Sequence, residues 1–469
     1  MELRIEESAA YINNAVSFRK SVFDKIADKN PNQVWLSASL KDVQNVVIIN
    51  SAPRSGSSLL FAILKKIPQF YSLSGEEIPF YKLNGLSCDT FPSDEIPEAV
   101  KEAKVYAFGM SRDFLSDFSI AGIQDRIIED NELLERYIDD LALRFPLEWP
   151  QIDFSYDVFK RLARQAFDNY REIYQGFSKE AFYLELLWLL RREYKTINPY
   201  YYDIPAGMIE KKFPELEIPS APPNPVIMIE EPPFILLSPR IKVSGRDLAG
   251  KTLLLKSSTN CYRMRFIEAL LPNADIKIIY LVRNPAASIN GLYDGWLYRG
   301  FFSHNLRYFF EKNKKDSGPE TLKIFGYSDK YEWGRWWWKY DLPPGWQSYA
   351  HSKLEEVCGF QWYAANRAIQ EYLKQSQKNY CLVSYENIIR SLEFRKKEIK
   401  KIMNFIGIRE SGIEQLGLDN LSIIQATDNP QPYRWKKRRD VLLPVLKSPG
   451  INRMSGHLGY NKKDIEEWL

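Results

Sequence analysis

A polar loop after the first strongly apolar run of the chain carries residue types suited to binding an anion. Four β-branched residues, Val46 to Ile49, end in this loop, and an amphipathic segment follows at once. The pattern predicts a buried strand, a tight turn and a helix, whose N-terminal N–H groups and dipole attract negative charge. A close backbone approach, hydroxyl donors and a fixed positive charge come from Arg54, Ser55, Gly56, Ser57 and Ser58.

Two other interpretations of this loop have to be weighed. An ATP or GTP P-loop requires Gly-x-x-x-x-Gly-Lys-Ser/Thr. The loop here has one glycine, no lysine after it, and Arg54 two residues before it. It therefore fits a phosphate better than a magnesium nucleoside triphosphate. The other interpretation is an ordinary strand–turn–helix capped by a serine.

A second segment repeats the arrangement. Ile276 to Val282 forms a near-continuous apolar run, as expected for a parallel strand covered on both faces. Arg283 follows at its carboxyl end, where open α/β sheets bind ligands, and Pro285 suits the first turn of a helix. Ser288 lies about one turn into that helix, within reach of the same anion. Two such units predict a ligand that carries two separate phosphates.

These two segments resemble the PAPS-dependent sulfotransferase family, in soluble, bacterial-type members. PAPS is 3′-phosphoadenosine 5′-phosphosulfate. Residues 53–58, Pro-Arg-Ser-Gly-Ser-Ser, are similar to the family's 5′-phosphosulfate loop, and residues 280–285, Tyr-Leu-Val-Arg-Asn-Pro, to the start of its 3′-phosphate motif. The resemblance implies that Arg283 binds the 3′-phosphate. The family usually has a serine eight residues after that arginine, where this chain has Gly291. The hydroxyl contact is either lost or supplied by Ser288.

Further matches occur in the family's order. Residues 253–258, Leu-Leu-Leu-Lys-Ser-Ser, resemble the segment before the 3′ strand and place Lys256 at a strand end. Residues 379–388 resemble the late strand and its Tyr-Glu-Asp-Leu turn. The role expected for Glu386 in this turn is structural. The resemblance spans residues 45–85 and 250–440.

Sulfuryl transfer needs a base for the acceptor proton and positive charge on the leaving oxygen. Residues 76–80, Glu-Glu-Ile-Pro-Phe, resemble the base segment of heparan-type sulfotransferases, which implies that Glu77 is the catalytic base. By the same resemblance, Arg54 and Lys256 neutralise the sulfuryl and 5′-phosphate oxygens, so no metal is required. The alternative for Glu77 is a solvated acidic turn. His304 and His351 do not lie where the family's histidine base does.

The densest basic run lies near the end of the chain, at residues 433–439. In the resembling family a late basic loop closes over the 3′-phosphate. We expect one or two of Arg434, Lys436 and Lys437 to touch phosphate and the others to be solvated.

A tryptophan-rich stretch covers residues 333–346. Its rings could stack on a flat acceptor or hold a cation. A packed hydrophobic insertion is the slightly favoured alternative.

Composition limits the remaining possibilities. The 64 basic and 60 acidic residues nearly balance, so no global field indicates nucleic acid or an anionic membrane as partner. Four cysteines without Cys-x-x-Cys spacing and three histidines disfavour a structural zinc site. The polar, acidic start and the lack of a long apolar run predict no signal peptide and no membrane span. We expect a cytoplasmic protein.

The predicted fold is α/β, with a P-loop-like central parallel sheet flanked by helices and a large helical insertion. Residues 1–44 form a helical lead-in, 45–100 and 250–469 the PAPS-binding core, and 101–249 a mainly helical insertion on the acceptor side. An aromatic-rich insertion covers 300–355. The expected function is sulfuryl transfer from PAPS to a hydroxyl or amine of a small molecule, with a weak preference for a cationic or aromatic one. The alternatives are a non-catalytic nucleotide-phosphate-binding protein and a P-loop kinase.

Overall fold

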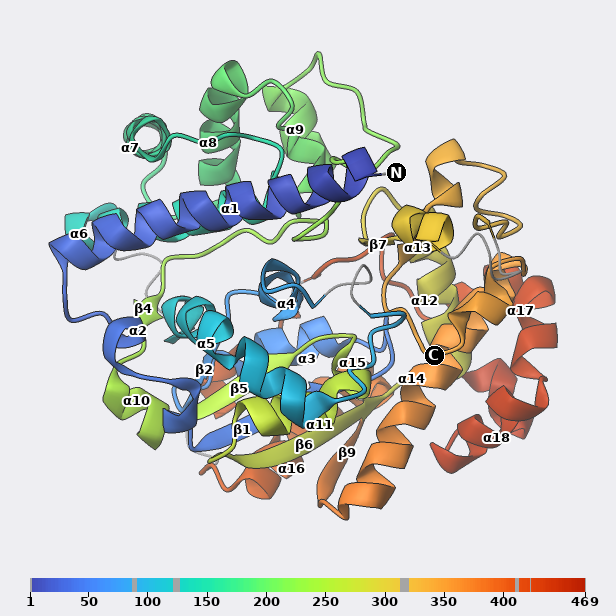
Figure 1. Ribbon diagram of the computed structural model, residues 1–469. Helices are drawn as coiled ribbons and strands as arrows, with labels where there is room; N and C mark the ends of the chain where they lie inside the picture. Colours follow the sequence, from blue (N-terminus) through green and yellow to red (C-terminus); the bar gives the residue numbers. More distant parts are fainter. Residues whose placement is uncertain are drawn as a thin grey trace.

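A seven-stranded, mostly parallel sheet forms the centre of the molecule (Figure 1). The computed structural model describes residues 2–86, 91–120, 127–312, 320–409, 413–421 and 423–468. The strand order is β4-β3-β2-β5-β1-β6-β9, and only the pairs of β3 with its two neighbours are antiparallel. The strands are β1 (Asn45–Asn50), β2 (Phe70–Ser72), β3 (Ser119–Ile120), β4 (Ile241–Lys242), β5 (Thr252–Lys256), β6 (Asp275–Val282) and β9 (Tyr380–Ser384).

The three central strands, β5, β1 and β6, lie in register at their carboxyl ends. Ile49 of β1 pairs with Lys256, and Asn50 pairs with Tyr280 of β6. These strands are buried on both faces, which is why they read as continuous apolar runs in the sequence. Because they are parallel, the loops that follow them emerge at one edge of the sheet.

Helices cover both faces of the sheet. Val47 and Ile49 pack with α3 and α16 on one face, whereas Val46 and Ile48 belong to the larger core on the other face, with α5, α11, α12 and α14. This alternation follows from the two-residue period of a strand. The bounds are α3 (Ser57–Leu64), α5 (Ala99–Asp117), α11 (Asn260–Leu270), α12 (Pro285–Leu297), α14 (Leu354–Ser376), α15 (Tyr385–Arg390) and α16 (Leu392–Ile406). The predicted α/β class and central parallel sheet are confirmed.

A second, mainly helical layer lies above the sheet in the view of Figure 1. It has a hydrophobic core of its own, to which the long first helix contributes Val22 and Phe23. The strands β3 and β4 also come from residues 101–249, the predicted insertion, but they lie at one end of the central sheet and extend it. The domain boundaries expected from the sequence stay predictions. The helices of this layer are α1 (Glu2–Lys29), α6 (Asn131–Glu148), α7 (Tyr156–Ile173), α8 (Lys179–Glu193) and α9 (Ala206–Lys212).

The remaining elements are short. Most lie between the elements described above, and α17 and α18 lie near the carboxyl terminus. The strands β7 and β8 pair in antiparallel fashion and form a separate two-stranded sheet. The elements are α2 (Val34–Ser37), α4 (Ile78–Leu83), α10 (Gly245–Gly250), β7 (Phe302–Asn305), α13 (Arg307–Lys312), β8 (Trp337–Lys339), α17 (Arg439–Leu446) and α18 (Pro449–His457).

The tryptophan-rich stretch is packed inside the molecule. Trp337, Trp338 and Trp346 are buried. Lys339 lies fully buried among them, with its Nζ 4.4 Å from the Phe302 ring centroid, and donates hydrogen bonds to the carbonyl oxygens of Gly295 and Tyr298. Burial lowers the pKa of Lys339 well below its usual value. The rings of Phe302, Tyr327 and Trp333 thus surround an amine of the chain itself, which supports the packing interpretation.

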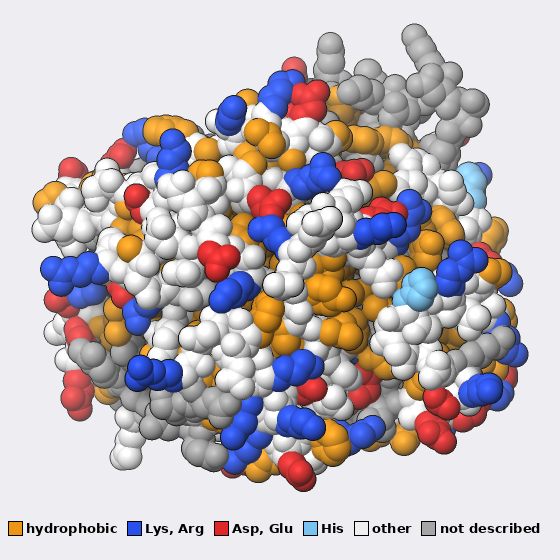
Figure 2. Space-filling model, turned by 90° about the horizontal axis from the view of Figure 1, so that it is seen from below, with side chains coloured by type: hydrophobic (Ala, Val, Ile, Leu, Met, Phe, Trp, Pro, Cys, Tyr) orange, Lys and Arg blue, Asp and Glu red, His pale blue; other side chains and the backbone are white. Residues whose placement is uncertain are grey.

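Charged side chains of both signs are interspersed over the face shown in Figure 2, around a central group of hydrophobic side chains. This agrees with the near balance of 64 basic and 60 acidic residues. Among the described residues, no helix combines the length and the apolar character that crossing a bilayer requires.

Glu386 braces the edge of the sheet that carries the functional loops. Its Oε1 accepts hydrogen bonds from the backbone N–H and the side-chain amide of Asn284, at 2.8 and 2.9 Å. Its Oε2 accepts hydrogen bonds from the hydroxyls of Ser384 and Tyr460, at 2.8 and 2.7 Å. The carboxylate thus joins the start of α12 to β9 and to the carboxyl-terminal region. The structural role expected for Glu386 is confirmed.

Replacing Glu386 with alanine is expected to lower the free energy of unfolding by about 3 kcal/mol, because several buried donors lose their acceptor. Urea denaturation of the variant and the wild type measures this loss. Glu393→Gln, at an exposed position of α16, is the matched control and should stay within about 0.5 kcal/mol of the wild type. A change of that small size in Glu386→Ala would contradict the bracing role.

Candidate active site

The loop between β1 and α3 has the backbone geometry of an anion-binding turn. Gly56 caps α3 in the left-handed region, with φ 92°, and has no side chain to bond the first N–H groups of the helix. Arg54 also has a positive φ, 62°, which is uncommon for a residue with a side chain. Ser55 is buried, whereas Ser57 and Ser58 are partly exposed. The loop leaves helix N–H groups available to a ligand, as the sequence predicts.

Tyr385 links this loop to the loop after β6. A Cβ atom on Gly56 would lie 2.1 Å from the ring of Tyr385, so the close approach requires glycine. The guanidinium carbon of Arg283 lies 4.6 Å from the centroid of the same ring. Arg283 also donates a hydrogen bond of 3.0 Å to the backbone oxygen of Arg54. The two anion-binding segments predicted from the sequence are therefore in direct contact.

Lys256 adds a third positive charge at this edge. Its side chain is buried and donates a hydrogen bond of 3.0 Å to the hydroxyl of Ser58. It also forms an ion pair with Glu76. The in-register ends of β1 and β5 bring Lys256 to the start of α3, although almost two hundred residues separate the two segments in the chain.

Among the described residues, no carboxylate forms an ion pair with Arg54 or Arg283. Arg54 donates to the backbone oxygen of Gln425 at 3.0 Å, and its guanidinium carbon lies 5.3 Å from the Phe301 ring centroid. Burial lowers the pKa of the Arg283 guanidinium, and the charges of Arg54 and Arg434 lower it further. Like charges held this close favour an anionic ligand between them.

Ser288 lies on the first turns of α12, fully buried, and its hydroxyl forms no hydrogen bond with any described residue. Gly291, at the position where the resembling family has serine, faces Arg54. A Cβ atom there would lie 3.2 Å from the Cβ of Arg54, so glycine lets the arginine side chain pack against the helix. Close packing against Arg54 thus explains why position 291 is glycine and not serine.

The carboxyl-terminal basic run divides between the site and the surface. Arg434 forms an ion pair of 2.8 Å with Asp294 of α12, and its charge is close enough to lower the pKa of Arg283. Lys437 instead lies 3.2 Å from Asp428 and Lys436 lies 3.9 Å from Glu466, both at exposed positions. The structure brings Arg434 to the site and leaves the two lysines on the surface.

Sequence reasoning missed Gln425, which contacts the anion-binding loop. Its side-chain oxygen accepts a hydrogen bond of 3.0 Å from Ser58, and its backbone oxygen accepts the bond from Arg54. Thr427 adds a hydroxyl 3.5 Å from the Arg54 guanidinium. These oxygens contact Arg54 and Ser58, the side chains expected to bind an anion. A bound anion therefore has to displace these oxygens or bind beside them. Gln425 has no charge or motif that marks it in the sequence.

Glu77 is completely buried at the start of α4, and neither of its carboxyl oxygens forms a hydrogen bond with a described residue. Burial raises its pKa to about 7, and the nearby charge of Lys256 lowers the pKa by less. A solvated acidic turn is therefore excluded. A carboxyl group with a pKa near neutrality can accept a proton efficiently at neutral pH.

The helical layer reaches the loop that carries Glu77. Arg144 of α6 forms an ion pair with Glu230, and a Cβ atom on Gly75 would lie 3.0 Å from the guanidinium of Arg144. Burial raises the pKa of Glu230 to about 7, with Arg144 opposing it. A residue of the layer predicted as an acceptor-side insertion thus lies close to Gly75, two residues before Glu77. No group of three or more His, Cys, Asp or Glu side chains suited to a metal occurs among the described residues.

The burial of Glu77 gives folding stability a specific pH dependence. The pKa of Glu77 is about 7 in the folded protein, against an ordinary 4.5. As the pH rises, the unfolded chain therefore releases this proton at a lower pH than the folded protein does. Relative to Glu77→Gln, the wild type should lose about 2 to 3 kcal/mol of stability as the pH rises from 5 to 8.5. Urea denaturation of both proteins at the two pH values measures the difference, and Glu215→Gln, at an exposed position, is the control. A difference that does not change with pH would contradict the burial of an ionisable carboxyl group.

Comparison with known proteins gives one family match. Residues 262–431, which include Arg283 and Ser288, match the family described as "Sulfotransferase domain". No curated protein matches the chain. A solved sulfotransferase domain from the Synechococcus PCC 7002 olefin synthase is 14% identical, with 90% of this chain and 96% of that chain covered and a TM-score of 0.32. A sulfotransferase domain from the curacin biosynthetic pathway is 12% identical, with 89% and 99% covered and a TM-score of 0.33. Over residues 262–431 the chain is thus similar to sulfotransferase domains, and this match supports sulfuryl transfer as the general reaction.

Proposed function

We propose that this protein transfers the sulfuryl group of PAPS to a hydroxyl or amine of a small-molecule acceptor, in line and without a metal. Glu77 is the general base in this proposal. Arg54 and Lys256 act at the sulfuryl end of the donor, and Arg283 binds its 3′-phosphate. Arg434 assists at the 3′-phosphate from the carboxyl-terminal side.

The observation that carries the proposal is the meeting of three cations, Arg54, Lys256 and Arg283, at the carboxyl ends of adjacent parallel strands. Two of them have no ion-pair partner among the described residues. Arg283 contacts the backbone of Arg54, and Gln425 joins Arg54 to Ser58, the hydrogen-bond partner of Lys256. A donor with phosphate groups at both ends of one nucleoside matches two adjacent cationic loops.

Unpartnered buried groups at the same edge also support a donor of this kind. The Nε of Arg283 and the hydroxyl of Ser288 are buried and have no hydrogen-bond partner in the part of the chain that the structure describes. Each unsatisfied buried group costs about 1 to 3 kcal/mol, a cost that a bound phosphate would relieve.

The proposed chemistry assigns a separate task to each side chain. The acceptor oxygen or nitrogen attacks sulfur, its proton passes to Glu77, and the sulfur–oxygen bond to the donor's 5′-phosphate breaks. Lys256 and the fork of Arg54 stabilise the negative charge that develops on the leaving oxygen. Glu76 holds Lys256 by an ion pair, and the hydroxyl of Ser58 accepts a hydrogen bond from its Nζ.

Replacing Glu77 with glutamine is expected to reduce turnover of PAPS at least a hundredfold, because the variant cannot accept the acceptor proton. Its affinity for 3′-phosphoadenosine 5′-phosphate (PAP) should stay within about twofold, because the base does not bind phosphate. In the wild type, kcat/KM should rise with pH through about 7 and then level off, because the carboxylate is the active form. Release of PAP measures turnover, and calorimetry measures binding.

The alternatives give different results in the same experiment. A wild type that binds PAP but never turns PAPS over is a nucleotide-binding protein without transfer activity. Magnesium-dependent transfer from ATP, lost in EDTA, would indicate a P-loop kinase. Glu215→Gln is the control, and a fall in its activity equal to that of Glu77→Gln would remove the assignment of the base. The cytoplasmic location stays a prediction.

A further inference from the structure

Glu77 lies at the end of a short loop that a distant carboxylate holds in place. The loop, residues 73–77, connects β2 to α4. Ser74 of this loop donates from its backbone N–H to Oδ2 of Asp117 at 2.7 Å and from its hydroxyl to Oδ1 at 2.8 Å. Asp117 is the last residue of α5. One carboxylate thus accepts both donors of Ser74, three residues before the proposed base.

Close packing also restricts the loop at Gly75. A Cβ atom there would lie 2.9 Å from Cδ1 of Ile235 and 3.0 Å from Nη2 of Arg144. Arg144 is buried and forms an ion pair with Glu230, so its guanidinium is itself held in place. Glycine is therefore required for the loop to pack this closely against the two side chains.

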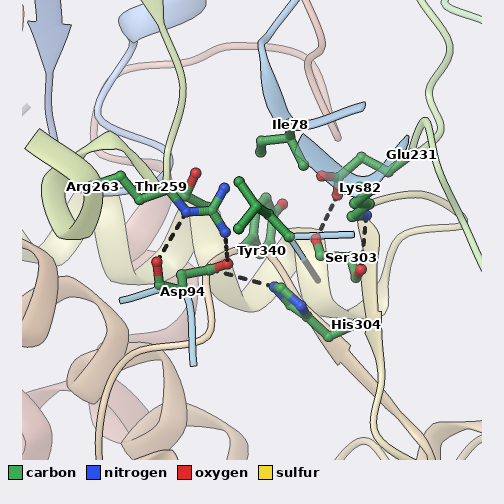
Figure 3. A pocket seen from close by; sticks show the side chains of 10 residues that line it. Ile78, Lys82, Asp94, Glu231, Thr259, Arg263, Ser303, His304 and Tyr340 are labelled. Atoms are coloured by element: carbon green, nitrogen blue, oxygen red, sulfur yellow. Dashed lines mark hydrogen bonds and ion pairs between the residues drawn. The ribbon is translucent and has the colours of Figure 1, made fainter. Parts of the chain in front are cut away.

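The helix after Glu77 is anchored at its other end. Lys82, buried in the last turn of α4, donates from Nζ to the backbone oxygens of Met228 and Ser303 at 2.9 and 3.0 Å. Figure 3 shows Lys82 beside Ser303 and Ile78 at the same hollow. This hollow has room for about one water molecule, so α4 has little space to shift into it. Glu77 thus lies between two anchored points of the chain.

Cations around Asp117 keep its carboxyl group ionised. Burial raises the pKa of Asp117, but three nearby cations lower it below its ordinary value. These cations are Lys242, Arg144 and Arg240. Lys242 also forms an ion pair of 2.6 Å with Asp140, a second carboxylate near Asp117. The hydrogen bonds from the loop to Asp117 are therefore charge-assisted.

The position of the loop determines the environment of Glu77. Among the described residues, the titratable groups near Glu77 include Glu76, Lys256 and Tyr81. Burial raises the pKa of Glu77 to about 7, Glu76 adds to this rise, and Lys256 opposes it. Burial also raises the pKa of Tyr81 well above its usual value, so this hydroxyl stays neutral. Because Glu76 forms an ion pair with Lys256, the same loop also sets the position of that lysine.

We propose that Asp117 is a positioning residue for the sulfuryl transfer and that it acts through Ser74. The two residues hold the loop so that Glu76 pairs with Lys256 and Glu77 stays buried. This inference rests on the proposed function. Without the carboxylate, the two donors of Ser74 lose their charged acceptor, and the loop moves toward solvent. Water then reaches Glu77, and the ion pair that orients Lys256 is weakened.

The first test measures the environment of Glu77 without turnover. Glu77→Gln is made in the wild type, in Asp117→Asn and in the milder variant Ser74→Ala, and urea denaturation gives the stability of each protein at pH 5 and 8.5. In the wild type the contribution of Glu77 falls as the pH rises, because the folded protein keeps this proton to a higher pH than the unfolded chain does. We expect this fall to shrink by about half or more in the other two backgrounds, because a solvated Glu77 has a lower pKa. A fall of the same size in all three backgrounds would overturn the inference.

The second test follows kcat/KM for PAP release from PAPS against pH. The probe acceptor is 4-nitrophenol, tyramine or methyl α-glucoside, whichever the wild type uses best. The wild-type profile should have its midpoint at about 7. In Ser74→Ala and Asp117→Asn we expect the midpoint to fall by about one pH unit and kcat to fall about tenfold. Affinity for PAP should stay within about twofold, because the loop does not carry the phosphate-binding residues.

Glu398→Gln is the matched control for a purely structural carboxylate. Glu398 is buried in α16, on the other face of the sheet, and bonds Asn387 at 2.9 Å and Lys401 at 3.0 Å. Its loss should lower stability and leave the midpoint unchanged. An unchanged midpoint in Ser74→Ala and Asp117→Asn would overturn the inference alone. A wild type that binds PAP but releases none from PAPS would overturn the proposed function together with it.

Discussion

The arrangement depends on positive charges that the fold holds together at one edge of a parallel sheet. Ile49 pairs with Lys256 and Asn50 with Tyr280. This register places the ends of three strands side by side, and Arg54, Lys256 and Arg283 therefore meet. Among the described residues only Lys256 of these three forms an ion pair, with Glu76. Holding like charges together lowers the stability of the fold, and the packing of the sheet offsets this loss. A bound dianion would remove the repulsion.

A few neutral contacts keep these charges in position. Tyr385 packs against Gly56 on one side and under the guanidinium of Arg283 on another. Glu386, the next residue, anchors the backbone before α12. Because both residues follow β9, the edge strand of the sheet supports the two anion-binding loops. Glu386 can thus be structural although it lies beside a functional site.

Around Glu77 the cost to stability comes mainly from buried polar groups that lack hydrogen bonds to described residues, not from like charges. Its two carboxyl oxygens and the side-chain amide of Asn260 are buried and form no hydrogen bond with a described residue. Buried groups of this kind lower stability, and burial is also the main cause of the raised pKa of Glu77.

The sequence predicts the central strands and their loops because buried parallel strands require apolar residues on both faces, and anion loops require glycine and hydroxyl residues. It does not predict which members of a basic run turn inward. Asp294, one turn beyond Gly291, selects Arg434, whereas Lys437 pairs with Asp428 at the surface. That selection depends on contacts between segments far apart in the chain.

Two other features depend on tertiary packing in the same way. The tryptophan-rich stretch encloses Lys339, a partner that spacing alone cannot identify. Gln425 is a neutral residue whose contact with Ser58 requires the late loop to lie across α3. Composition and periodicity carry no signal for either contact.

Calorimetry of nucleotide binding to the purified wild type tests the central claim most directly. PAP and AMP share the adenosine and the 5′-phosphate and differ in the 3′-phosphate, which the account assigns to Arg283. Charge-assisted hydrogen bonds of about 1.5 to 3 kcal/mol each predict that PAP binds at least a hundredfold more tightly than AMP. Equal affinities would contradict the account of two cationic loops that bind opposite ends of one donor.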